Sequence, residues 1–233
     1  MNGEKDYERI RFDEIDSTNE YAKSRRGERR NLIVTAKRQT GGLGTKGRSF
    51  SSEEGGVYLT RLTFYEGFPV GDAFKIMSET AVAVCETLRA YGLHPVVKWP
   101  NDVYVRDKKI CGILIENVFS GREIFSSTVG IGLNVYNGLP VELAENATTM
   151  WRETGKRYDV EEVTERLIAE LGKRRSGEEY LSYIGYMGRQ ATLIIGNESV
   201  PVTLLLVDSA GGLHVRTKDG EVRYTAAEVS LRL

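Results

Sequence analysis

The sequence contains only two cysteines, two histidines and five prolines. Cys85 and Cys111 share no CxxC spacing and lie in apolar segments, which favours small buried residues in a reducing compartment. His94 and His214 lie far apart, and neither has a cysteine or histidine neighbour at metal-ligand spacing. We therefore expect no zinc site and assign no metal-ligating residue. A GxSxG nucleophile elbow is also absent, which argues against a serine hydrolase.

Long apolar runs and an excess of one charge are missing as well. No apolar run approaches the ~20 residues of a membrane-spanning helix, and the N-terminal sequence MNGEKDYERIRF has no hydrophobic signal core. The formal net charge is -1, so no global basic field favours nonspecific nucleic-acid binding. At 233 residues, the chain is long enough for one large domain, or for a domain with a small appendage. We expect a cytoplasmic protein with no membrane and no DNA partner.

The segment 98–116, KWPNDVYVRDKKICGILIE, predicts a β-hairpin. Pro100 ends a short extended segment, the polar run 106–109 predicts a turn, and the apolar return strand closes at Glu116. Gly112 within that strand indicates a close approach of a ligand or of another backbone. Cations, a carboxylate and an amide lie around this hairpin, where together they could bind a polyanion with its metal ion. They are Lys98, Asn101, Asp102, Lys108 and Lys109. A surface hairpin with a solvated basic turn is the alternative.

Two earlier segments offer polar groups to a ligand. Ser17, followed three residues later by Glu20, predicts the capped start of a helix whose first turn could bind a polar group. A cap without a ligand is the alternative. The loop RQTGGLGTKGRSF at 38–50 is rich in glycine and cations and predicts an anion-binding nest. It is not a P-loop, because Arg48 stands where lysine is required and a turn and strand follow instead of a helix. A flexible linker is the alternative.

The rest of the chain supplies a core and a second module. Helical spacing of apolar residues predicts a buried helix at 72–91 and an amphipathic helix at 159–171. Between them, a strand ends near Gly130, Gly132 and Asn134. A short helix is expected after the second helix, at 180–187. Five short strands punctuated by turns follow from Gly188, the pattern of a small closed barrel.

These segments, in this order, resemble the biotin protein ligases. The matching stretches are DSTN at 16–19, RQTGGLGTKGRSF at 38–50, EGGVY at 54–58, KWPNDVYVRDKKICGILIE at 98–116, GIGLNV at 130–135 and EVSLR at 228–232. They span nearly the whole chain, and the KWPND hairpin is the specific one. The resemblance implies an α+β fold with a mixed β-sheet flanked by helices, related to class II aminoacyl-tRNA synthetases, at 1–187. The resemblance also implies a small C-terminal Src-homology-3-like β-barrel at 188–233. The chain looks like the ligase-only type, without the N-terminal DNA-binding domain of the repressing members.

The resemblance implies ATP-dependent biotinylation of one lysine on a biotin carboxyl carrier protein. Biotin and ATP, with Mg²⁺, would form biotinyl-5'-AMP, and the carrier lysine would then be acylated. A homodimer is left open. Two alternatives remain: a lipoate or octanoate ligase on the same fold, and a noncatalytic module that binds nucleic acid. The near-neutral charge counts against the second alternative.

The resemblance also implies roles for individual residues. Lys109 would contact the biotin carboxyl and the phosphate, and Asp102 would orient the incoming amine or a magnesium ion. The implied biotin-binding residues are Ser17, Thr18, Asn19, Gln39, Gly42, Lys109 and Gly112. The implied ATP- and adenylate-binding residues are Gly44, Lys46, Gly47, Arg48, Phe50, Asn101 and Asn134. Thr45 and Leu43 replace basic residues of the family's loop, so we expect weaker retention of the adenylate.

Overall fold

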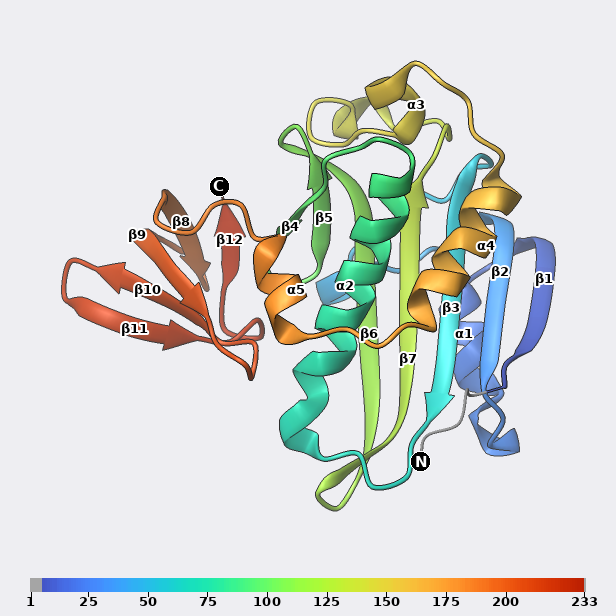
Figure 1. The fold of residues 1–233 in the computed structure, drawn as a ribbon, viewed down its shortest axis with the longest axis horizontal. Helices are drawn as coiled ribbons and strands as arrows, with labels where there is room; N and C mark the ends of the chain where they lie inside the picture. Colours follow the sequence, from blue (N-terminus) through green and yellow to red (C-terminus); the bar gives the residue numbers. More distant parts are fainter. Residues whose placement is uncertain (1–5, 233) are drawn as a thin grey trace.

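The computed structural model describes residues 6–232, without the side chain of Lys46. A seven-stranded mixed sheet forms the larger part of the molecule (Figure 1). Its first two strands pair in parallel and every other neighbouring pair is antiparallel. In spatial order the strands are β1 (Glu8–Ile15), β2 (Leu32–Gln39), β3 (Gly56–Phe64), β7 (Glu123–Asn134), β6 (Lys108–Ser120), β5 (Asp102–Val105) and β4 (Val96–Lys98).

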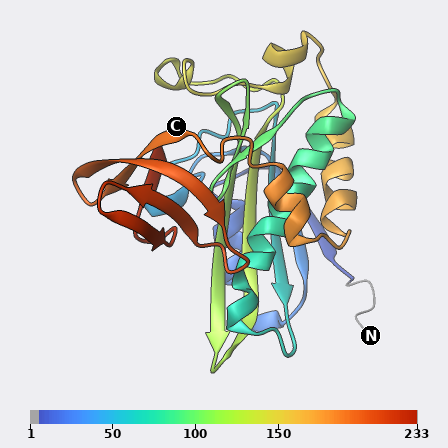
Figure 2. The same cartoon turned by 60° about the vertical axis from the view of Figure 1, so that its left-hand side comes forward.

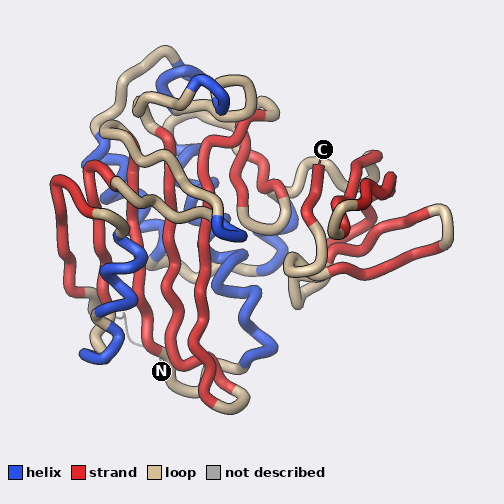
Figure 3. The backbone as a smooth tube through the Cα atoms, turned by 180° about the vertical axis from the view of Figure 1, so that it is seen from behind, coloured by secondary structure: helices blue, strands red, loops and turns tan. Residues whose placement is uncertain are grey.

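Helices cover the two faces of this sheet unequally. One face carries α2 (Ala73–Ala90), α4 (Val160–Leu171) and α5 (Gly177–Ser182) (Figure 1). The other face carries α1 (Thr18–Ser24) and, beside it, the glycine-rich loop, as the view from behind shows (Figure 3). α3 (Met150–Thr154) lies at one end. Single 3₁₀ turns occur at η1 (Arg26–Glu28), η2 (Thr45–Gly47), η3 (Val70–Asp72) and η4 (Val141–Leu143).

The main core lies between the sheet and α2. Val82, Val84 and Leu88 of α2 are fully buried, as are Val129 and Leu133 of β7. Side chains alternate between faces along a strand, so the even-numbered β7 residues Gly130, Gly132 and Asn134 face the other way, toward α1. The core therefore leaves the α1 face of the central strands free to form a site. None of the helices in residues 6–232 has the length and apolar character to cross a membrane.

A second, antiparallel sheet of five strands stands beside the first (Figure 2). Its spatial order is β11 (Gly220–Tyr224), β10 (Leu213–Thr217), β9 (Glu198–Val207), β8 (Gln190–Ile195) and β12 (Ser230–Arg232). The expected fold class, a mixed sheet flanked by helices with a small C-terminal β-domain, is confirmed. We propose a domain boundary near residue 188, because α5 ends at Ser182 and β8 starts at Gln190.

Two local expectations are corrected. The short helix lies at Gly177–Ser182, not at 180–187, because Ser176 and Glu179 form a reciprocal capping box that starts it within the polar run. β6 continues past Glu116 to Ser120, because its partner β7 is long enough to pair with it along that whole length.

Candidate active site

The hairpin of β5 and β6 brings Asp102 and Lys109 together. A two-residue turn at Arg106 and Asp107, both at positive φ, connects the strands. The register places Asp102 opposite Gly112, and Lys109 Nζ lies 2.7 Å from Asp102 Oδ1. A Cβ atom at Gly112 would lie 3.2 Å from Lys109 Nζ, so the missing side chain leaves room for the lysine to fold back. The expected convergence of this cation and carboxylate is present.

The other three polar residues of the hairpin lie in different settings. Asn101 belongs to the scaffold, since its Nδ2 donates to the Ile113 carbonyl at 2.8 Å. Lys98 Nζ lies 5.0 Å from the ring centroid of Tyr104, and burial is the main cause that lowers the Lys98 pKa, with Lys109 and other cations adding to it. Lys108 lines neither of the cavities described below. A half-buried cation therefore accompanies the Lys109–Asp102 pair.

The start of α1 forms the inner end of the site. Ser17 Oγ accepts from the backbone N–H of Glu20, as the capping pattern predicts. Thr18 donates from its backbone N–H and its hydroxyl to Gln39 Oε1, at 2.8 and 2.9 Å. Asn19 Oδ1 accepts from Thr60 at 2.5 Å beneath Gly130. Ser17, Thr18 and Asn19 are almost completely buried, so their polar groups are held in fixed directions.

The glycine-rich loop is a small closed hairpin. The backbone N–H of Gly44 donates to the Arg48 carbonyl at 2.7 Å, and that of Phe50 to the Gly42 carbonyl at 2.8 Å. The N–H groups of Gly41 and Arg48 are also bonded within the protein, so an anion nest would have to use other backbone amides of the loop, and it stays a prediction. The Arg48 side chain donates to the Thr45 carbonyl and hydroxyl, at 3.2 and 3.1 Å.

Two connected cavities lie over these groups. The inner pocket has a volume of about 40 Å³, and the outer groove, which also borders the second domain, has about 840 Å³. The predicted residues that line the inner pocket are Ser17, Thr18, Asn19, Gln39, Gly44, Phe50, Asn101, Asp102, Lys109 and Gly112. Those that line the groove are Gly44, Arg48, Phe50, Asn101, Asp102, Lys109 and Asn134. Lys109 and Asp102 thus lie where the two cavities meet.

Four of the predicted site residues do more or less than line a cavity. Gly42 lines neither cavity, but a Cβ atom there would lie 2.4 Å from the Phe50 carbonyl oxygen. Gly47 is at the exposed tip of the loop, and the Lys46 side chain lies outside the described residues. Asn134 is buried, donating to the Thr148 carbonyl at 3.0 Å and accepting from Asn137 at 3.1 Å. Its amide is largely committed to the fold.

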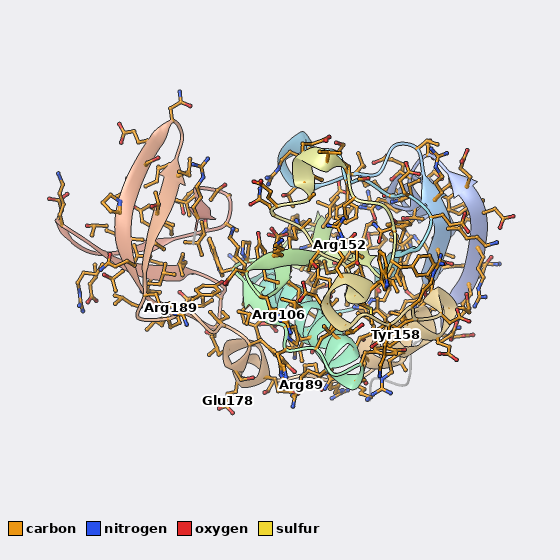
Figure 4. All side chains as sticks on the ribbon, turned by 90° about the horizontal axis from the view of Figure 1, so that it is seen from above. Arg89, Arg106, Arg152, Tyr158, Glu178 and Arg189 are labelled. Atoms are coloured by element: carbon orange, nitrogen blue, oxygen red, sulfur yellow. The ribbon has the colours of Figure 1, made fainter. Side chains whose placement is uncertain are left out.

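Sequence reasoning missed Ser52 and the segment 139–148. Ser52 is buried and accepts from Gln39 Nε2 at 2.8 Å, although in the sequence it is one of several serines in a turn. The segment 139–148 pairs with Lys109, whose backbone N–H donates to the Asn146 carbonyl at 2.9 Å. In the chain, α3 comes directly after this segment. In the view from above, α3, labelled at Arg152, lies near the β5–β6 turn, labelled at Arg106 (Figure 4). No sequence pattern linked either element to the site.

Residues 12–134 match the family model described as the biotin/lipoate A/B protein ligase family, and the chain belongs to this family.

The chain is also similar to individual proteins and to solved structures. The chain is 31% identical to a biotin--[acetyl-CoA-carboxylase] ligase of Paracoccus denitrificans, over 92% of this chain and 96% of that protein. It is 28% identical to the bifunctional ligase/repressor BirA of Bacillus subtilis over 85% of this chain, and it spans 66% of that relative's length. Among solved structures, it is similar to the biotin protein ligase from Aquifex aeolicus in complex with biotin and ATP. That match has a TM-score of 0.76 and 30% identity, and it covers 96% of this chain and 98% of the other.

Proposed function

We propose that this protein attaches biotin, in an ATP-dependent reaction, to a lysine of a biotin carboxyl carrier protein. The observation that carries the proposal is the position of Lys109, whose side chain borders both the inner pocket and the outer groove. A single cation at that junction can contact a carboxylate that arrives from one side and a phosphate that arrives from the other. The likeness to a ligase structure that contains biotin and ATP supports this assignment.

The inner pocket is proposed to hold the fused rings of biotin. A ureido group needs donors and acceptors at fixed positions, and Ser17, Thr18 and Gln39 supply them at the buried end. Gly112 and Gly132 provide a floor without side chains along the path toward Lys109. The acyl chain would lie on this floor and bring the carboxylate to the lysine.

The first chemical step is adenylation. A biotin carboxylate oxygen attacks the α-phosphorus of ATP, the bond from that phosphorus to the bridging oxygen of the β-phosphate breaks, and pyrophosphate leaves. Lys109 stabilises the negative charge shared between carboxylate and phosphate. Arg48 and Lys98 border the same groove and add positive charge for the departing pyrophosphate. No covalent bond to the protein forms.

Mg²⁺ fits this donor set as a companion of the nucleotide. Asp102 is the one carboxylate among the described residues that line the two cavities, and the described residues contain no cluster of three metal-binding side chains. Mg²⁺ commonly binds through one or two carboxylates together with substrate phosphates. Asp102 would supply that carboxylate, and the bound ion would neutralise phosphate charge.

The second step is acyl transfer in the open groove. The carrier lysine attacks the acyl carbon of biotinyl-5'-AMP, the bond to the phosphate oxygen breaks, AMP leaves, and the amine loses a proton. Residues of the second domain, such as Ala226 and Leu231, border the groove and would face the carrier. We place the reaction in the cytoplasm, where ATP and reduced thiols are present.

Mass spectrometry of a biotin-acceptor domain tests the function. Incubation with this protein, ATP, Mg²⁺ and biotin should add one biotinyl group to a single lysine. Omission of ATP should abolish the addition. The proposal is wrong if the acceptor stays unmodified and the protein catalyses ATP–pyrophosphate exchange with lipoate but not with biotin.

A further inference from the structure

The ring of Phe50 rests on bare backbone at the centre of the site. Gly112 of β6 and Gly132 of β7 face each other in the sheet register. A Cβ atom at Gly132 would lie 2.4 Å from Phe50 Cε1, and one at Gly112 would lie 3.3 Å from Cε2. Any side chain at Gly132 would therefore collide with the ring, and the two glycines form a shelf that the ring covers.

Phe50 also lies where the two cavities meet. It borders both of them, together with Lys109, whereas Gln39 borders only the inner pocket. The inner pocket of about 40 Å³ has room for only a few water molecules, since one water needs roughly 10–15 Å³ of such space. A bicyclic ligand with an acyl chain does not fit while the ring covers the shelf. The ring therefore occupies space that such a ligand must use.

A chain of hydrogen bonds connects Phe50 to the inner end of the pocket. Ser52 Oγ donates to the Phe50 carbonyl at 3.0 Å and accepts from Gln39 Nε2 at 2.8 Å. Gln39 Oε1 in turn accepts both donors of Thr18. A ligand that turns the Gln39 amide toward itself moves Nε2 away from Ser52, so the hydrogen bond between Gln39 and Ser52 is lost. The orientation of the Gln39 side-chain amide is thus linked, through Ser52, to the backbone of Phe50.

We propose that Phe50 occupies the acyl-chain segment of the pocket before ligand binding, and that Ser52 is a positioning residue that couples its displacement to Gln39. This inference rests on the proposed function, because it takes biotin as the ligand. The ring must leave the Gly112–Gly132 shelf before the acyl chain can lie there. Biotin then binds only to the fraction of molecules in which the shelf is open, and its association is limited by the opening step.

The test is the dependence of the association rate on biotin concentration, measured with radiolabelled biotin by rapid filtration. In the native protein, the observed rate should level off at high biotin. In Phe50→Ala it should rise linearly, with an initial association rate constant larger by about tenfold or more, as an open fraction of roughly 0.1–10% requires. Ser52→Ala keeps the Phe50 ring but loses the hydrogen bonds of Ser52 with the Phe50 carbonyl and with Gln39. The plateau rate of this variant should therefore rise by several-fold.

Two exposed variants serve as matched controls. Phe119→Ala and Ser199→Ala remove the same groups at exposed positions outside both cavities and should reproduce the native curve. Thermal unfolding of each variant separates loss of fold from loss of occlusion, and Phe50→Leu replaces Phe50→Ala if the latter does not fold. A linear native curve, with equal rate constants in Phe50→Ala, overturns the inference while the proposed function stands. Absence of biotin binding in every protein overturns both.

Discussion

At the scale of single residues, the site depends on one close ion pair. Lys109 and Asp102 lie 2.7 Å apart with both side chains partly exposed, so substrates can compete for either partner. An ion pair in such a setting contributes little to stability by itself. Its proposed role is to keep a cation and a carboxylate ready for the substrates at the junction of the two cavities.

Replacement of Lys109 should affect the first step most strongly. In Lys109→Ala, the rate of ATP–pyrophosphate exchange with biotin should fall by about 10²–10³-fold, the usual loss when one group that stabilises developing charge is removed. Lys108→Ala removes the adjacent lysine, which lines neither cavity, and should keep nearly the native rate. Equal losses in the two variants would contradict the assigned role.

Thr45 provides a second test at the residue scale. The resemblance to the biotin protein ligases implies a basic residue at this position, and here the threonine hydroxyl accepts from Arg48 at 3.1 Å instead of supplying a cation. Thr45→Arg should add positive charge over the adenylate and slow the release of biotinyl-5'-AMP by roughly tenfold, about 1.4 kcal/mol. The release rate is measured by single-turnover formation followed by dilution. An unchanged rate would contradict the expectation that Thr45 weakens retention of the adenylate.

At the scale of elements, the glycine-rich loop is held in place by backbone contacts. Gly42 lies against the Phe50 carbonyl and the Ser52 hydroxyl, where a Cβ atom would stand 2.4 and 2.5 Å from their oxygens. Gly42→Ala should therefore displace the loop and weaken biotin binding about tenfold, measured by calorimetry. Gly27→Ala, with no atom within 4 Å of the new Cβ, should bind biotin as the native protein does. Unchanged affinity in Gly42→Ala would mean that the loop does not position the site.

Hydrophobic periodicity was sufficient to predict the strands and long helices, including α2 and the five strands of the second domain. It could not predict contacts set by pairing between distant segments. The Gln39–Ser52 bond joins two ends of a loop, and the Gly112–Gly132 shelf depends on the register of β6 with β7. The helix near residue 180 was misplaced because a local cap outweighed the apolar pattern. Resemblance supplied the residue roles that periodicity could not.

At the scale of the whole molecule, a specific hydrogen bond joins the end of β4 to a turn of the second sheet. Trp99 Nε1, almost fully buried, donates to the Gly211 carbonyl at 3.0 Å. Gly211 lies in a turn that Asp208 organises, since the Asp208 carboxylate accepts from the backbone N–H groups of Ala210 and Gly212 at 2.9 Å each. Arg223 Nε also donates to this carboxylate. His214 Nε2 lies 2.9 Å from its Oδ2. The turn thus connects the second sheet to the end of β4, beside the groove.

This arrangement predicts acid sensitivity of the second domain. The hydrogen bond from Arg223 is the main cause that holds the Asp208 pKa well below its usual range. Because the folded pKa lies below the unfolded value of about 3.9, the carboxylate stabilises the fold above that pH, and the stabilisation is lost as pH falls below it. Urea unfolding between pH 7 and pH 3, followed by near-ultraviolet circular dichroism, should show this loss. Asp208→Asn should be less stable near neutral pH and show a smaller decline on acidification, whereas Asp219→Asn, at an exposed turn of the same sheet, should follow the native protein. A native-like decline in Asp208→Asn would assign the acid sensitivity to other carboxylates.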